Sequence, residues 1–339
     1  MNKKEYIMDR IFKGSAGLAQ GIFVTLGIGL LLENIGRMAG IDALTTIGTV
    51  TKTLMAPGIG VGVAVALGGN ALTVFSSMAA ATLGAASLTI VQAMPITIKG
   101  GEPIGAVLAA IVATYVGKKI AGKTKLDMMI IPLSAVLVGG LFGYYASEII
   151  TPILNNVGAL ITNATQSSLL ISSVVIAVVW GCLIMSPASS VALAVALSLN
   201  EQASAAALVG CTAHFIGFTL MSYKENDLGG VMATFLCTPK VQLPNVTKNF
   251  KLMIPTLIAS AVAAPIAVMA FGLKAETSIA GMGLSSFVAP INILSTQGPK
   301  ELLGFIIGCI IIPGIISYIV YKLMKTNGMI KDGDLKLPQ

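Results

Sequence analysis

The sequence predicts an all-α membrane protein that crosses the bilayer many times. Of its 339 residues, 55% are hydrophobic and only 10% are charged, and the mean hydropathy is +0.89. Long apolar runs recur between short polar breaks, and about 20 apolar residues suffice for one helical crossing. We therefore expect an all-α polytopic membrane protein with about ten transmembrane helices and re-entrant hairpins, built from two weakly related halves.

The candidate crossings share an apolar composition that suits a helix in lipid. They are residues 14–32, 54–69, 71–98, 104–117, 128–150, 168–185, 187–199, 203–222, 252–272 and 301–323. Two shorter runs, 228–238 and 281–296, are rich in Gly, Pro or Ser and are expected as re-entrant hairpins or half-helices. Glycines four residues apart, such as Gly17 and Gly21, suit close helix packing, although chance alone produces such pairs in a chain with 37 glycines.

The net charge of +7 indicates an orientation in the membrane and not a nucleic-acid partner. Basic residues gather before the first run, in two loops and after the last run, and the positive-inside rule places such segments in the cytoplasm. We expect a cytoplasmic N-terminus (1–13), a membrane domain (14–325) in contact with lipid, and a cytoplasmic tail (326–339). The uncharged stretch 151–166 suits an external loop.

No catalytic, cofactor or metal site is expected. The four cysteines lie in apolar surroundings without paired spacing, and His214 is the only histidine, so no histidine cluster can bind zinc. No Walker motif occurs, and no hydrophilic segment is long enough for an ATPase domain, which excludes an ATP-driven pump within this chain. The first apolar run lacks a convincing signal-peptide cleavage site.

An acidic break, Gly100-Gly101-Glu102-Pro103, separates two apolar runs in the first half. A carboxylate near membrane depth is costly and is usually functional, and broken backbone there is buried in protein or lines a wet cavity. We expect Glu102 to contact a polar substrate, and the alternative is a helix-capping loop at the membrane surface. Asn70 supplies a further polar break.

The second half holds a serine-rich break and a membrane histidine. Ser186, Ser189 and Ser190 interrupt an apolar region beside a proline, and a helix that starts at Ser190 would direct its first amides into the break. The alternative is an ordinary Ser-Pro turn. His214 lies within an apolar helix, either as a ligand contact or as a structural residue.

Further polar residues of the second half complete the candidate substrate-binding set. They are Glu225, Asn226, Gln242, Asn245 and Ser285. A weak echo between residues 125–132 and 248–255 suggests two halves, with an acidic break upstream of each, as in many transporters; chance similarity and a solvated loop at 224–227 are the alternatives. Amides and hydroxyls around few carboxylates suit a sugar or a similar polyhydroxylated molecule better than a cation.

Four motifs together resemble the membrane subunit IIC of bacterial phosphotransferase systems, in particular the stand-alone IIC-like branch of toxin regulators that includes the perfringolysin O regulator. The motifs are Met185–Ser190, Gly210–His214, Ser222–Asn226 and Gly281–Ser286. The resemblance covers roughly residues 14–325. It implies a homodimer in the bacterial cytoplasmic membrane, with a scaffold part, a mobile transport part and a sugar bound near a glutamate such as Glu102. His214 departs from the amide side chain expected there.

The resemblance implies a sugar permease subunit that works by alternating access. Because the chain contains neither a IIA nor a IIB domain, phosphorylation would belong to separate IIA and IIB proteins. Two other functions stay open: a membrane sensor or regulator that binds a sugar-like ligand without transport, and a secondary transporter of a small polar solute.

Overall fold

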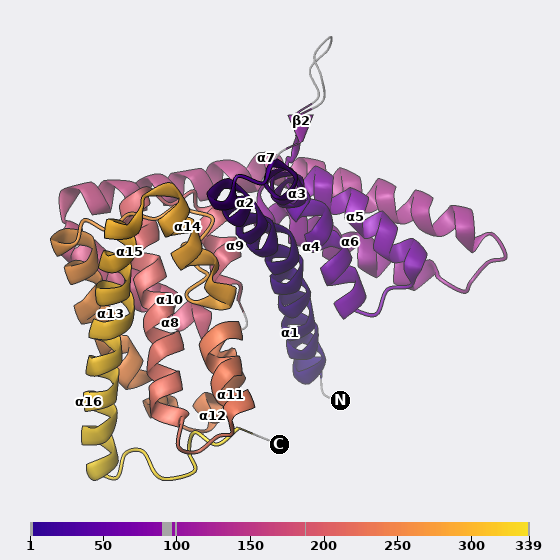
Figure 1. The fold of residues 1–339 in the computed structure, drawn as a ribbon. Helices are drawn as coiled ribbons and strands as arrows, with labels where there is room; N and C mark the ends of the chain where they lie inside the picture. The colour runs from indigo at the N-terminus through magenta and orange to yellow at the C-terminus, as the bar shows by residue number, and fades with distance from the viewer. Residues whose placement is uncertain (1–2, 90–96, 99, 187, 338–339) are drawn as a thin grey trace. The chain divides into compact units, whose positions relative to one another are not determined.

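A computed structural model describes residues 3–89, 97–98, 100–186 and 188–337, almost all of them in helices and turns (Figure 1). The exceptions with regular structure are two strands of two residues each, β1 (Leu88–Thr89) and β2 (Thr97–Ile98), which form an antiparallel pair. The all-α class predicted from the sequence is confirmed. The chain divides into two compact units: unit 1 comprises 1–157 and 195–197, and unit 2 comprises 158–194 and 198–339.

Unit 1 is a set of packed helices that share small residues at their contacts. They are α1 (Lys3–Ile22), the π-helical turn η1 (Phe23–Gly27), α2 (Ile28–Ala39), α3 (Asp42–Thr53), α4 (Met55–Ala66), α5 (Ala71–Gly84), α6 (Pro103–Ile120) and α7 (Asp127–Ser167), the last of these up to residue 157. Helix α1 packs on α4, α4 on α5 and α5 on α6, while α2 and α3 form a separate hairpin.

Glycines let α1 approach the backbone of α4. A Cβ atom added at Gly17 would lie 2.2 Å from the carbonyl oxygen of Gly62, and one added at Gly21 would lie 2.5 Å from that of Gly58. Gly17 and Gly21 on α1 therefore face Gly58 and Gly62 on α4, which is small-residue packing of the kind found between membrane helices. The expectation for this glycine pair is confirmed.

Unit 2 is built around one helix that is buried on all sides. Its elements are α8 (Leu169–Ile184), α9 (Ser190–Ala196), α10 (Glu201–Ser222), α11 (Leu228–Met232), η2 (Ala233–Cys237), η3 (Pro239–Gln242), α12 (Leu243–Lys248), η4 (Phe250–Met253), α13 (Ile254–Pro265), η5 (Ile266–Ala270), η6 (Ser285–Phe287), α14 (Val288–Thr296), α15 (Pro299–Phe305), η7 (Ile306–Ile311) and α16 (Ile312–Thr326). Helices α8, α13 and α16 pack around α10 (Figure 1), whose Phe215 and Phe218 are fully buried.

Within the described residues, six helical segments are long and apolar enough to cross a membrane, or seven if the bent pair α3 and α4 counts as one span. They are Glu5–Ala39, Pro103–Ile120, Asp127–Ser167, Glu201–Ser222, Phe250–Ala270 and Pro299–Thr326. The multi-pass character is thus confirmed, but the expected count of about ten is not. The bent pair turns by 60°.

Local chain breaks explain the difference in count. The run 71–98 is helical only to Gly84, after which come β1 and β2; its residues 90–96 lie outside the described part. The run 187–199 contains the seven-residue α9, about 10 Å long at 1.5 Å per residue and too short for a core of about 30 Å. The stretch 151–166, expected as an external loop, is instead part of α7.

Candidate functional site

The serine-rich break between α8 and α9 in unit 2 is held by hydrogen bonds from its own serine side chains. The hydroxyl of Ser186 donates to the carbonyl of Leu183 (2.8 Å) and accepts from the N–H of Ala188 (3.1 Å). The hydroxyl of Ser189 accepts from the N–H of Ala192 (3.2 Å), which caps the first turn of α9. Pro187 lies outside the described residues.

Ser190 ties this break to a segment that is distant in the sequence. Its hydroxyl is buried and donates to the carbonyl of Gly281 (2.8 Å). A Cβ atom on Gly281 would lie 2.4 Å from the carbonyl carbon of Ser190, so only glycine permits this approach. The carbonyl of Ser190 also accepts from the indole nitrogen of Trp180 on α8 (3.2 Å).

The segment that begins at Gly281 forms a tight, irregular tip before α14. Gly283 has φ of +58°, and the two residues Ser286 and Phe287 also have left-handed backbone, with φ of +46° and +55°. Such conformations in non-glycine residues are strained and cluster at functional segments. Ser285 is half-buried within this tip, and its N–H donates to the carbonyl of Met282 (3.1 Å).

Lys240 in η3 closes the same break from another side. Its ammonium donates to the carbonyl of Ser186 (2.8 Å) and to the carbonyl of Ala188 (2.7 Å). Burial lowers the pKa of Lys240 to about 8, because a desolvated ammonium is less stable than in water. The break thus joins three separate parts of unit 2: residues 186 and 188–190, residue 240 and residue 281.

His214 is fully buried in α10. Its Nδ1 lies 2.9 Å from the carbonyl oxygen of Gly210, so Nδ1 carries the proton and Nε2 is an acceptor. Nε2 is buried and has no hydrogen-bond partner in the described structure. A Cβ atom on Gly181 of α8 would lie 2.4 Å from Cε1 of the ring, so the imidazole packs directly against α8. Gly181 follows Trp180, whose indole nitrogen donates to the carbonyl of Ser190.

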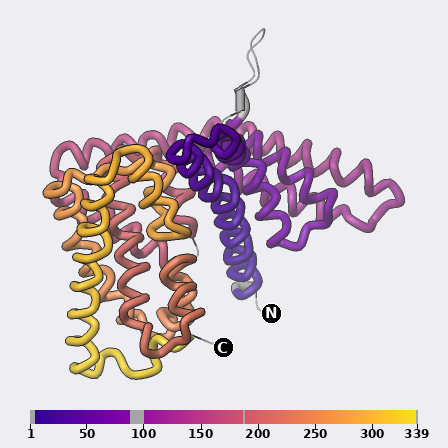
Figure 2. Tube along the Cα trace, in the orientation of Figure 1, coloured from indigo at the N-terminus to yellow at the C-terminus, as the bar shows by residue number. Residues whose placement is uncertain are grey.

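The four remaining candidates of unit 2 form a second group, which holds the C-terminal tail. Glu225 accepts from the N–H of Leu335 (3.0 Å), and the carbonyl of Leu335 accepts from the amides of Asn226 (2.9 Å) and Gln242 (3.1 Å). Asn245 donates to the carbonyl of Lys336 (3.0 Å). Leu335 itself is fully buried. We call these four residues the tail clamp, and Figure 2 shows the chain after α16 turning back toward α11 and α12.

Glu102 and Asn70 lie in unit 1, and each caps a helix. Glu102 accepts from the N–H groups of Ile104 and Gly105 at the start of α6, and Asn70 accepts from the N–H of Thr73 (2.9 Å) at the start of α5. A Cβ atom on Gly117, near the end of α6, would contact Thr73. Asn70 and Glu102 therefore lie at opposite ends of α6, roughly 27 Å apart for 18 residues, and they do not share one ligand.

The structure also contains a buried ionic cluster that sequence reasoning missed. Glu33 on α2 is only 4% exposed and pairs with Arg37 one turn later and with Lys52 on α3. The signal in the sequence was an acid within a long apolar helix, four residues before a base. Trp180 and Lys240 were missed as well, although a single tryptophan and a lysine between two prolines were visible.

A family model described as "Phosphotransferase system, EIIC" matches residues 12–337. The chain belongs to the phosphotransferase system EIIC family. No curated protein matches the chain. The match, together with the apolar spans, identifies a multi-pass membrane protein that is the permease component of a sugar phosphotransferase system.

Lys240 gives this EIIC protein a pH-dependent stability. In the unfolded chain a lysine keeps its proton up to about pH 10.4, whereas folded Lys240 loses it near pH 8. Between these values the unfolded state binds more protons, so the free energy of unfolding rises with pH. The melting temperature of the wild type, relative to that of Lys240→Met, should therefore rise from pH 8 to pH 10 and stay level below pH 8. A difference that is flat across this range would contradict the buried position of the ammonium.

Variants of Glu102 can show how much its helix-capping bonds contribute to stability, separately from any contact with a ligand. Serine also caps helices well, whereas loss of an N-cap to alanine costs about 1 kcal/mol. We expect Glu102→Ser to melt close to the wild type and Glu102→Ala to melt lower. If both variants melt together with the wild type, the capping bonds of Glu102 contribute nothing to stability.

Proposed function

We propose that this EIIC protein binds a sugar in unit 2 at the break formed by residues 186 and 188–190. The observation that carries the proposal is the meeting of three chain segments at this break, through Ser190 with Gly281 and Lys240 with the carbonyls of Ser186 and Ala188. Hydroxyl groups, backbone carbonyls and an amine are the groups that recognise sugar hydroxyls. Family membership supports a sugar as the ligand.

The buried acceptor of His214 supports the same placement. An unpaired buried polar atom is destabilising, and a sugar hydroxyl is a donor that suits a free Nε2. We therefore include His214 in the site, together with Ser186, Ser189, Ser190 and Ser285. In unit 1, Glu102 is proposed as a separate sugar contact, because each capped carboxylate oxygen still has a free lone pair.

We further propose transport by alternating access, with phosphorylation by separate IIA and IIB proteins, and a homodimer. The strained tip 281–287 and the break are the segments proposed to move.

Both termini are proposed to be cytoplasmic. In support, Arg10 and Lys118 of unit 1 donate to the same carbonyl, that of Leu67, so two basic segments assigned to the cytoplasm by the positive-inside rule lie at one end of that unit.

The test is a thermal-shift screen of the detergent-solubilised protein against sugars and polyols, since a ligand of the folded state raises the melting temperature. We expect a shift with one sugar, lost in His214→Ala and Ser190→Ala. Ser147→Ala is the control, because Ser147 on α7 makes an ordinary hydroxyl bond to a backbone carbonyl. If no sugar shifts the wild type, or if the two site variants keep the shift, the proposed site is wrong.

Transport mechanism has its own readout. In proteoliposomes, uptake of that sugar should require the cognate IIA and IIB proteins, and the product inside should be the sugar phosphate. Uptake driven instead by a proton or sodium gradient would favour a secondary transporter. Light scattering of the purified protein should give twice the monomer mass.

A further inference from the structure

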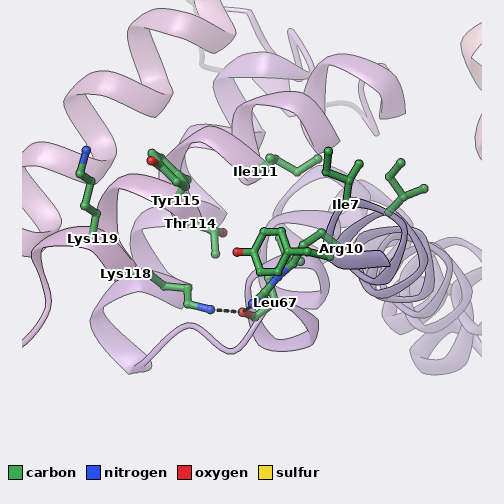
Figure 3. A pocket seen from close by; sticks show the side chains of 10 residues that line it. Ile7, Arg10, Leu67, Ile111, Thr114, Tyr115, Lys118 and Lys119 are labelled. Atoms are coloured by element: carbon green, nitrogen blue, oxygen red, sulfur yellow. Dashed lines mark hydrogen bonds between the residues drawn. The ribbon is translucent and has the colours of Figure 1, made fainter. Parts of the chain in front are cut away.

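Unit 1 contains a pocket whose lining includes none of the residues proposed above as sugar contacts. Its volume is about 550 Å³, and it lies between α1 and α6 beside the turn at Leu67 (Figure 3). The lining residues come from one face of each helix. They are Tyr6, Ile7, Arg10, Ile11, Leu67, Ile111, Thr114, Tyr115, Lys118 and Lys119.

The wall of the pocket is apolar and open. Ile7, Ile11 and Ile111 are exposed by 48%, 49% and 39%. All three belong to helices that are long and apolar enough to cross a membrane. Tyr6 and Tyr115 flank this wall and are also exposed. Apolar side chains exposed on a membrane span face lipid chains, and tyrosines mark the level of the headgroups.

Three cations line the pocket, and two of them, Arg10 and Lys118, meet at Leu67. Arg10 and Lys118 both donate to the carbonyl of Leu67, as Figure 3 shows for Lys118, and Lys119 lies over the ring of Tyr115 (5.8 Å). The described lining residues include three cations and no carboxylate. Nε of Arg10 is buried and has no hydrogen-bond partner in the described structure. One N–H of this guanidinium therefore lacks an acceptor, although another donates to Leu67.

We propose that this pocket binds an anionic phospholipid. Its phosphate would lie beside Arg10 and Lys118 and accept the free hydrogen of Arg10, with Lys119 at the other side of the headgroup, and an acyl chain would cover Ile11 and Ile111. A phosphate accepts charge-assisted bonds from arginine and lysine, and anionic lipids concentrate at the basic, cytoplasmic side of membrane proteins. A soluble anion would satisfy the cations but would leave the isoleucine wall uncovered, so the apolar wall favours a lipid.

Native mass spectrometry of the delipidated protein tests the proposal, with phosphatidylglycerol and phosphatidylcholine of identical acyl chains as probes. We expect one tightly bound phosphatidylglycerol per chain and much weaker phosphatidylcholine. The double variant Arg10→Gln/Lys119→Gln should bind the anionic lipid at least tenfold more weakly, since each cation contributes about fivefold. It retains the bond from Lys118 to Leu67.

Lys123→Gln/Lys125→Gln is the matched control, because it removes the same charge from the exposed loop after α6. This control should bind phosphatidylglycerol like the wild type. Ile111→Gln, which makes the wall polar and leaves the charge of the pocket unchanged, should also lose the lipid. The proposal is overturned if the control weakens binding as much as the double variant, if Ile111→Gln binds normally, or if glycerol phosphate alone displaces the lipid at equal concentration.

Discussion

Replacing Gly17 with alanine should strongly destabilise unit 1, whereas the same change at Gly14 should be tolerated. The two glycines are three residues apart on α1, but their surroundings differ. A Cβ atom at Gly17 would lie 2.2 Å from the carbonyl oxygen of Gly62, while no atom lies within 4 Å of one at Gly14. Backbone cannot withdraw as a side chain can, so α1 would have to separate from α4.

The expected penalty at Gly17 exceeds the roughly 1–3 kcal/mol of ordinary overpacking, because a helix–helix contact is lost. Size-exclusion chromatography of both variants in detergent, followed by thermal melting, measures the effect. Gly14→Ala should elute as a single peak and melt near the wild type, and Gly17→Ala should aggregate or melt far lower. Equal behaviour of the two variants would show that α1 and α4 do not pack through these glycines.

The second large effect is expected at Gly281, where even alanine should abolish sugar binding. Its Cβ atom would lie 2.4 Å from the carbonyl carbon of Ser190 and from the nitrogen of Val191. The tip must therefore move away from the break, and the 2.8 Å bond from Ser190 to the carbonyl of Gly281 is lost. Because the proposed site consists of these segments in contact, ligand affinity depends on their approach.

We expect the sugar affinity of Gly281→Ala to fall at least tenfold, which corresponds to about 1.4 kcal/mol of binding free energy. Gly229→Ala on α11 is the control, since its Cβ atom would have its nearest neighbour, an oxygen of Asp227, at 3.6 Å. Circular dichroism checks that both variants remain helical. A Gly281→Ala protein that binds sugar like Gly229→Ala would place the sugar away from the break.

The class of the protein was predictable because it depends on composition and on short motifs. Apolar runs of about 20 residues cross lipid as helices, and the serine break, the His214 region and the glycine tip carry the family resemblance within contiguous residues. The structure then joins Ser190 to Gly281, across 91 residues. No local pattern specifies that contact.

The number of spans and the tail clamp were not predictable for different reasons. Hydropathy does not detect where a helix stops, so the run that begins with α5 looked continuous although the helix ends at Gly84. The amides of Gln242 and Asn245 looked like ligand contacts because their partners lie in the tail, more than 90 residues later. A polar side chain in an apolar sequence indicates that a hydrogen-bond partner is needed, but the sequence does not identify that partner.

The tail clamp also makes the order of synthesis matter. Asn226 leaves the ribosome 109 residues before Leu335, whose carbonyl it binds. At 5–20 residues per second this interval is roughly 5–20 seconds, during which the clamp residues have no backbone of the tail to bind. A chain that stops before Leu335 leaves the clamp unfilled permanently. Because Leu335 follows α16, the clamp closes only after every helix of unit 2 has been synthesised, so its four side chains are the last polar groups of that unit to find their partners.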